Sequence, residues 1–287
     1  MSIHVKCEPD GIPLITVCNR FASAVIALNG GQILEYVRHG EPPVLWMSQY
    51  SYLEDGKAIR GGVPIVWPWF GAHQNNEMPS HGFARLYRWE IESTNESTDG
   101  PSKVVLTLNH RQVPEKFVDA TFDLRMTFII GMELSMSLEI INTDNEKPLS
   151  YSCALHSYFN ISEIREISIN GLENIAYRDA VAGKDGFDTK PIQFDAELDR
   201  IYRDSDEPCV IHDPGYNRQI EIIKSGSNST VVWNPWIEKS KRLQDFGDDE
   251  YNTMVCVETA NFQREGEGIV LPKQSDIITS IIKVKNL

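Results

Sequence analysis

The sequence has few cysteines and none of the spacings that commit them to a structural role. Five cysteines stand at positions 7, 18, 153, 209 and 256, without a CxxC pair. Three of them lie in apolar runs, where a reduced thiol packs as a small hydrophobe. An odd count without paired spacing argues against a disulfide framework or a zinc site. It favours a reducing, cytoplasmic setting.

Long apolar runs and excess basic charge are missing as well. No run approaches the ~18 residues that a membrane span needs, and the N-terminal MSIHVKCEPDG lacks the basic-then-apolar pattern of a signal peptide. The 27 Lys and Arg stand against 41 Asp and Glu, a formal net charge of -14. Nucleic acid and membranes are therefore not expected as partners, and an anionic ligand would need local arginines to overcome the overall field.

Several sequence motifs for cofactors, metals and nucleophiles are also absent. The chain contains no GxxxxGK[ST], no GxGxxG after a strand, no GxSxG and no HExxH. A nucleotide-binding loop, a nucleophile elbow and a helical zinc site are thus not indicated. We expect neither a metal nor an organic cofactor.

Strand patterns dominate what is present. Apolar residues alternate in TFDLRMTFII (121–130) and in MELSMSLEII (132–141), with Gly131 between them. This period of two predicts a hairpin with one buried face. Similar runs occur at 22–28, 103–108, 150–159 and 230–234. The pattern predicts a large antiparallel β-sandwich or barrel, with residues 1–287 forming a single domain.

Helical signals are few. Asn234 is a suitable N-cap with Pro235 at the first helical position, and Trp236, Leu243 and Phe246 follow at helical spacing. This predicts a helix that ends at Gly247. The Gly- and Asp-rich segment 179–195 indicates a long loop.

Two ionisable residues interrupt apolar strand runs. His156 lies in SCALHSYFNIS, and Glu258 follows four apolar residues in MVCVETAN. A buried carboxylate is costly unless it is paired or faces a cavity. A core histidine bonded to a carbonyl, or a glutamate that turns outward at a strand end, would also explain the pattern. From the residues alone, both interpretations stay open.

A second unusual stretch is SHGFAR at 80–85, where His81 and Arg85 flank Gly82. Two glycines also follow Arg60 in IRGGVPIVWPWFG. Glycines allow positive φ or a close backbone approach, and arginines suit an anion. A surface turn is the alternative interpretation of the first stretch.

Three more residues allow two interpretations each. Trp67 and Trp69 are better explained as core residues than as a platform for a sugar ring, although aromatic faces suit sugars. Asp199, in ELDRIYRD, is a surface residue on composition alone.

Six motifs nevertheless occur in one order across residues 59–261: IRGGVPIVWPWFG, PSHGFARLYRWE, LHSYFNI, LDRIY, WNPW and VCVETAN. Together they resemble the aldose 1-epimerase (mutarotase) superfamily, and within it the glucose-6-phosphate 1-epimerase branch. The resemblance implies a large antiparallel β-sandwich that acts as a monomer. It implies His156 as general acid and Glu258 as general base. It also implies substrate binding by Arg60, Ser80, His81, Arg85 and Asp199, although some relatives have Gln at the position of Ser80.

The implied chemistry suits these residue types. Exchanging the anomers of a pyranose requires a base to take the anomeric hydroxyl proton while an acid protonates the ring oxygen, and the open aldehyde then closes on its other face. A carboxylate at Glu258 would favour a protonated His156, and the fork of Arg60 or Arg85 matches a phosphate. Three alternatives remain: a non-catalytic carbohydrate-binding sandwich, a mutarotase of free sugars, and a glycosidase or lyase. The arginines disfavour the second, and a histidine acid disfavours hydrolysis by paired carboxylates.

Overall fold

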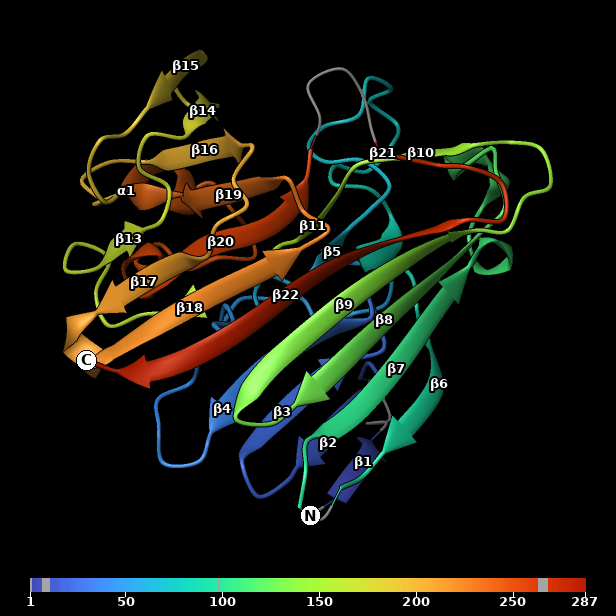
Figure 1. The fold of residues 1–287 in the computed structure, drawn as a ribbon, viewed down its shortest axis with the longest axis horizontal. Coiled ribbons are helices and arrows are strands. Elements are labelled where there is room, and N and C mark those ends of the chain that lie inside the picture. Colours follow the sequence, from blue (N-terminus) through green and yellow to red (C-terminus); the bar gives the residue numbers. More distant parts are fainter. Residues whose placement is uncertain (1, 7–10, 98, 263–267) are drawn as a thin grey trace.

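Antiparallel strands make up most of the molecule (Figure 1). The structure is a computed structural model that describes residues 2–6, 11–97, 99–262 and 268–287. Within these residues the strands form two eight-stranded sheets, one four-stranded sheet and one two-stranded sheet. The predicted large antiparallel β-sandwich is confirmed, because the two large sheets share one hydrophobic core.

The first large sheet crosses the front of Figure 1, with the long strands β22, β9 and β8 at its centre. In spatial order it contains β13 (Ser168–Asn170), β17 (Cys209–Asp213), β18 (Arg218–Ser225), β22 (Ser275–Asn286), β9 (Glu133–Asn142), β8 (Phe122–Ile130), β7 (Ser102–Asn109) and β6 (Glu90–Asn95).

The second large sheet carries the residues of greatest chemical interest. Its spatial order is β15 (Lys184–Phe187), β14 (Ala176–Asp179), β16 (Leu198–Arg203), β19 (Ser229–Asn234), β20 (Met254–Asn261), β11 (Cys153–Leu155) and β5 (Ile65–Val66), and β12 (Tyr158–Asn160) also pairs with β20.

The remaining elements are small. The four-stranded sheet consists of β1 (Ser2–Lys6), β2 (Leu14–Cys18), β3 (Ala22–Ala27) and β4 (Gln32–Arg38), and the two-stranded sheet of β10 (Leu149–Tyr151) and β21 (Gly268–Val270). Short helical turns are η1 (Ala84–Leu86), η2 (His110–Gln112), η3 (Glu115–Phe117), η4 (Pro214–Tyr216), η5 (Glu250–Thr253) and the α-helix α1 (Trp236–Ser240). No described helix has the length and apolar character needed to cross a membrane.

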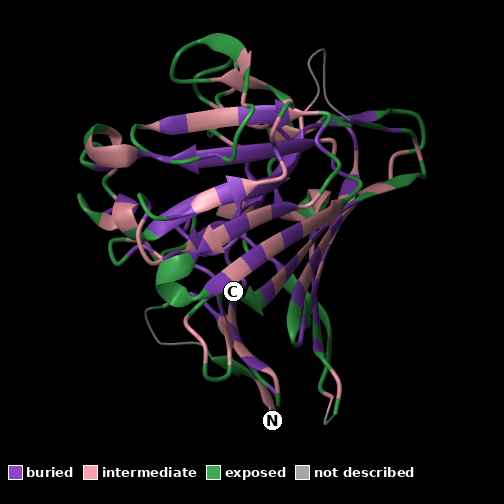
Figure 2. Cartoon of the chain, turned by 60° about the vertical axis from the view of Figure 1, so that its left-hand side comes forward, coloured by how far each residue is buried: buried purple, intermediate pink, exposed green. Residues whose placement is uncertain are grey.

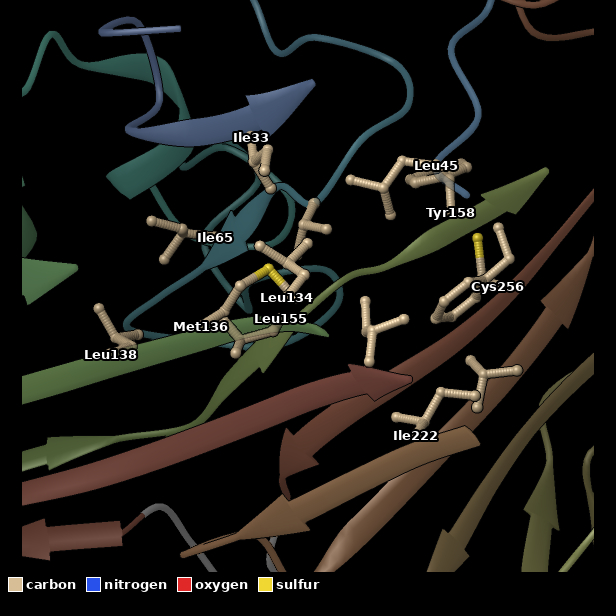
Figure 3. Packing of buried hydrophobic residues seen from close by; sticks show 14 of the residues in the cluster. Ile33, Leu45, Ile65, Leu134, Met136, Leu138, Leu155, Tyr158, Ile222 and Cys256 are labelled. Carbon is tan, nitrogen blue, oxygen red and sulfur yellow. The ribbon is translucent and has the colours of Figure 1, made fainter. Parts of the chain in front are cut away.

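The predicted hairpin forms as the alternation indicates. β8 pairs with β9 from Phe122↔Asn142 to Ile130↔Leu134, and buried, mainly apolar residues alternate along both strands with less buried, mainly polar ones. Figure 2 shows this alternation as stripes along the long strands. The buried set meets side chains of the other sheet, as Met136 and Leu155 do in Figure 3. Burying each such side chain stabilises the fold by about 1.5–3 kcal/mol, so this packing holds the two sheets together.

Three local predictions were wrong. The helix after Asn234 is only five residues long, because the chain leaves it in i→i+3 turns around Ser240, whose hydroxyl donates to the Asp248 carbonyl. The segment 179–195 is not one long loop, since β14 and β15 form a hairpin there, with no buried residue and no apolar alternation. The run 150–159 is divided among β10, β11 and β12, and His156 falls between two of these strands.

Candidate active site

His156 and Glu258 face each other across paired strands. Leu155 in β11 pairs with Thr259 in β20, and Tyr158 in β12 pairs with Cys256. His156 lies in the irregular step between these pairs, directly across from Glu258. Its Nε2 is 3.3 Å from Oε1 of the glutamate. The glutamate is buried, 1% exposed, so it does not turn outward at the strand end.

Burial controls the charge of this pair. It raises the pKa of Glu258 well above its usual value, and the negative charge of Asp199 raises it further. It lowers the pKa of His156 well below its usual value, and the cations Arg60 and Arg85 add to that effect. The expectation that Glu258 would favour a protonated His156 is therefore wrong, because desolvation prevails and lowers the pKa of His156.

These two shifts favour the form of the pair in which Glu258 carries a proton and His156 is neutral. That proton can sit on the carboxyl group or on the imidazole, and the two forms have the same net charge. Two further buried atoms of the pair, His156 Nδ1 and Glu258 Oε2, have no hydrogen-bond partner among the described residues. Unpaired buried polar atoms cost about 1–3 kcal/mol each. Such a cost is typical of catalytic sites, where function retains it.

Arg60 is held firmly beside the pair. Its Nε and Nη2 donate to the two carboxylate oxygens of Asp245 at 3.2 and 3.1 Å, and its Nη1 donates to the Tyr158 hydroxyl at 3.0 Å. The backbone that carries it needs glycine, because a Cβ on Gly62 would lie 2.2 Å from the Ile33 carbonyl oxygen. A guanidinium has five N–H groups, so one remains on each terminal nitrogen of Arg60.

Arg85, on η1, has fewer commitments. Its Nη2 donates to the Ser80 carbonyl at 2.7 Å, while its buried Nε has no hydrogen-bond partner among the described residues. Burial and the charge of Arg60 lower the pKa of Arg85 to about 10. No ion pair with a described carboxylate offsets this cation. Arg85 is therefore the group at the site with the greatest unmet demand for an anion.

The HGFAR backbone explains why these residues stand together. His81 and Gly82 both have positive φ, 60° and 70°. A Cβ on Gly82 would lie 2.0 Å from the Trp67 carbonyl oxygen, so only glycine allows this approach. The turn places the His81 ring 6.0 Å from that of His156. Burial, with the charges of Arg85 and Arg60, lowers the pKa of His81 to about 3. His81 therefore faces the site as a neutral ring.

Ser80 and Asp199 take different positions. The hydroxyl of Ser80 donates to the Gly71 carbonyl at 3.3 Å, and its own carbonyl orients Arg85. Asp199 lies on β16 opposite Trp233, and Lys239 Nζ is 3.7 Å from its carboxylate and 2.9 Å from that of Glu197. Burial raises the pKa of Asp199, and Lys239 opposes the rise.

Four residues at the site were not identified from the sequence. The Tyr158 ring stacks on His156 with centroids 4.8 Å apart, and Trp233 meets His156 edge-on at 6.2 Å. Both belong to motifs noted above, LHSYF and WNPW, which could have identified them. Asp245 and Lys239 lie in a stretch rich in charge, where no local pattern distinguishes them. Trp67 and Trp69 are buried core residues, as favoured.

Comparison with known proteins places this arrangement in a family. The aldose 1-epimerase family model matches residues 13–276. A protein of Salmonella typhimurium is 36% identical over 87% of this chain and 83% of its own length, and one of Escherichia coli K12 is 34% identical over 95% and 90%. Both are provisionally named glucose-6-phosphate 1-epimerase.

Solved structures agree. A crystal structure from Salmonella typhimurium, provisionally titled a mutarotase, has a TM-score of 0.92 and 31% identity, covering 99% of this chain and 94% of that one. A galactose mutarotase-like protein of Clostridium acetobutylicum has a TM-score of 0.74 at 13% identity, over 100% and 99%, which shows the shared fold alone. The chain therefore belongs to the aldose 1-epimerase family.

Proposed function

We propose that this protein is an isomerase that interconverts the α and β anomers of a hexose 6-phosphate, glucose 6-phosphate first among them. The observation that carries the substrate class is Arg85, a cation with a buried Nε and no ion pair to a described carboxylate, whose charge acts on both His156 and Glu258. A neutral sugar would leave Arg85 and the free N–H groups of Arg60 without an anion. The names of the relatives support the same substrate.

The His156–Glu258 pair supplies both proton transfers. Glu258, as the carboxylate, takes the proton of the anomeric hydroxyl, and His156, as the imidazolium, protonates the ring oxygen. The ring opens to an aldehyde, rotation about C1–C2 exposes the other face, and closure reverses both transfers. General acid–base catalysis of this kind contributes about 10² to 10⁴ in rate. Arg60 and Arg85 hold the phosphate, while Asp199, His81 and Ser80 complete the substrate contacts.

The remaining assignments are proposals too. We place the protein in the cytoplasm as a monomer that binds neither nucleic acid nor membranes. The four described cysteines are free, and Cys153, Cys209 and Cys256 are buried, which suits a reducing compartment. The assignment of residues 1–287 to one domain stays a prediction.

Polarimetry on pure anomers tests the substrate class. We expect the protein to speed the equilibration of α-glucose 6-phosphate far more than that of α-galactose, because only the ester engages the arginines. Preference for galactose would keep the chemistry and reject the phosphate. No acceleration of either sugar, together with saturable binding of glucose 6-phosphate, would make the protein a binding module.

Asp199 offers a test through pH. The active pair carries one proton, so activity falls on the alkaline side as Glu258 loses it and His156 stays neutral. Because Asp199 raises the pKa of Glu258, Asp199→Asn should move the alkaline limb of kcat/KM to lower pH. Glu197→Gln is the matched control, since Glu197 contacts the same lysine but does not act on the pKa of Glu258. An unmoved limb in Asp199→Asn would mean that another group sets it.

A further inference from the structure

Asp245 is a carboxylate that lies beside Arg60, one of the two arginines proposed to bind the phosphate. A negative side chain is unexpected in a site for an anion. Asp245 accepts two hydrogen bonds from Arg60, and both side chains are largely shielded, 16% and 21% exposed. Its negative charge cancels that of Arg60 and would repel a bound phosphate. Such a residue weakens phosphate binding, so its presence calls for a compensating role.

The contacts of Arg60 point to that role. Beyond Asp245, the guanidinium donates to the Tyr158 hydroxyl at 3.0 Å. The Tyr158 ring stacks on His156 at an interplanar angle of 11°, and it also stacks on Trp46 with ring centroids 5.8 Å apart. A guanidinium fixed in its plane by two bonds to a carboxylate thus fixes the ring that packs against His156.

The charges near the phosphate position have a simple sum. Arg60 and Arg85 contribute two positive charges, and Asp245 removes one. With Asp245 in place, the site presents about one net positive charge in a fixed geometry. Without it, the site would present two, and Arg60 would be free to turn toward any phosphate that enters.

We propose that Asp245 is a positioning residue that gives up phosphate affinity in exchange for the orientation of Arg60 and His156. The proposal rests on the function proposed above. By neutralising Arg60, Asp245 keeps the site from retaining inorganic phosphate, so that binding of the ester depends on the sugar as well. By fixing Arg60, it keeps Tyr158 and the imidazole aligned for proton transfer.

Asp245→Asn separates the two effects. It removes the charge while keeping the size of the side chain. We expect kcat for glucose 6-phosphate to fall by about tenfold, because the acid loses alignment. We expect KM for the ester not to rise. In calorimetric titration, inorganic phosphate should bind about fivefold more tightly, because one repulsive charge is gone.

Two further variants complete the experiment. Asp245→Glu keeps the charge, so its affinity for inorganic phosphate should stay near that of the wild type; affinity equal to that of the Asn variant would overturn the charge argument. Asp249→Asn removes the same charge from an exposed position in the same loop. The Asp249 side chain makes no hydrogen bond that caps the following helical turn. This variant should leave kcat and phosphate affinity unchanged, and a matching gain in affinity would reduce the effect to overall charge.

A purely structural role for Asp245 gives a different result. Asp245→Asn would then lower the melting temperature and weaken the binding of ester and inorganic phosphate together, or change neither, and either outcome would overturn the proposal. Phosphate titration requires no turnover. A wild-type protein that fails to exchange the anomers of glucose 6-phosphate would therefore refute the proposed function separately, while the phosphate affinities still judge the charge argument.

Discussion

Glu258→Gln should lower kcat for anomer exchange of glucose 6-phosphate by about 10² to 10⁴, with substrate affinity changed only a few-fold. The amide keeps the size of the side chain but cannot accept the proton of the anomeric hydroxyl, and general-base catalysis of that magnitude is lost. Binding is retained because the arginines that hold the phosphate are untouched. Polarimetry gives the rate, and calorimetric titration with glucose 6-phosphate gives the affinity.

Substitution of His156, the other member of the pair, provides the comparison for this variant. His156→Gln should reduce kcat similarly, and the double variant should be little worse than either single one, because the two residues act as a unit. Wild-type turnover in Glu258→Gln would remove the glutamate from the mechanism.

Glu258→Gln should also have a higher free energy of unfolding than the wild type above about pH 4.3. Because the pKa of Glu258 is raised in the folded protein, its contribution is fully present below the pKa of the unfolded chain and is lost as pH rises toward the folded value. Glutamine has no such dependence. The melting temperature of Glu258→Gln should therefore exceed that of the wild type by an amount that grows from about pH 4.3 upward, at about 2–4 °C per kcal/mol. A constant difference across pH would contradict the raised pKa.

Arg85→Met should raise KM for glucose 6-phosphate by about tenfold to 100-fold and leave the rate on free glucose nearly unchanged. A charge-assisted hydrogen bond is worth about 1.5–3 kcal/mol, and each 1.4 kcal/mol is a factor of ten. Methionine keeps an apolar stem of similar length. Initial rates with the two sugars, measured side by side, check the result.

A matching test of Arg60 must also change Asp245, because removing Arg60 leaves the Asp245 carboxylate without its ion-pair partner. Arg60→Met alone would leave the Asp245 carboxylate facing the phosphate. The matched variant is Arg60→Met with Asp245→Asn, which deletes the ion pair as a whole. Equal losses on glucose 6-phosphate and glucose in Arg85→Met would contradict the phosphate assignment.

The sequence predicted those parts of the fold that local periodicity specifies. The alternation from 121 to 141 gives β8 and β9 because each strand buries one face against the core. The β14–β15 hairpin was missed because none of its strand residues is buried and its apolar residues do not alternate. The predicted helix was too long because spacing cannot show that the chain turns after Ser240.

The candidate site was predicted from motifs, and its electrostatics were not. His156 and Glu258 stood out as ionisable residues in apolar strands, but the resemblance gave them their roles. Asp245 meets Arg60 across 185 positions of sequence, so no local pattern connects them. The direction of the pKa of His156 depends on burial together with neighbours from other parts of the chain, and spacing does not reveal either.

Exchange NMR on glucose 6-phosphate in D₂O tests the central claim most directly. The proposed mechanism opens and closes the ring while moving only oxygen-bound protons. We therefore predict exchange cross-peaks between the α and β H1 signals that depend on the protein and disappear with Glu258→Gln, without deuterium entering at C1 or C2. Cross-peaks that persist in that variant, loss of the H2 signal, or no exchange with the wild-type protein would contradict the account.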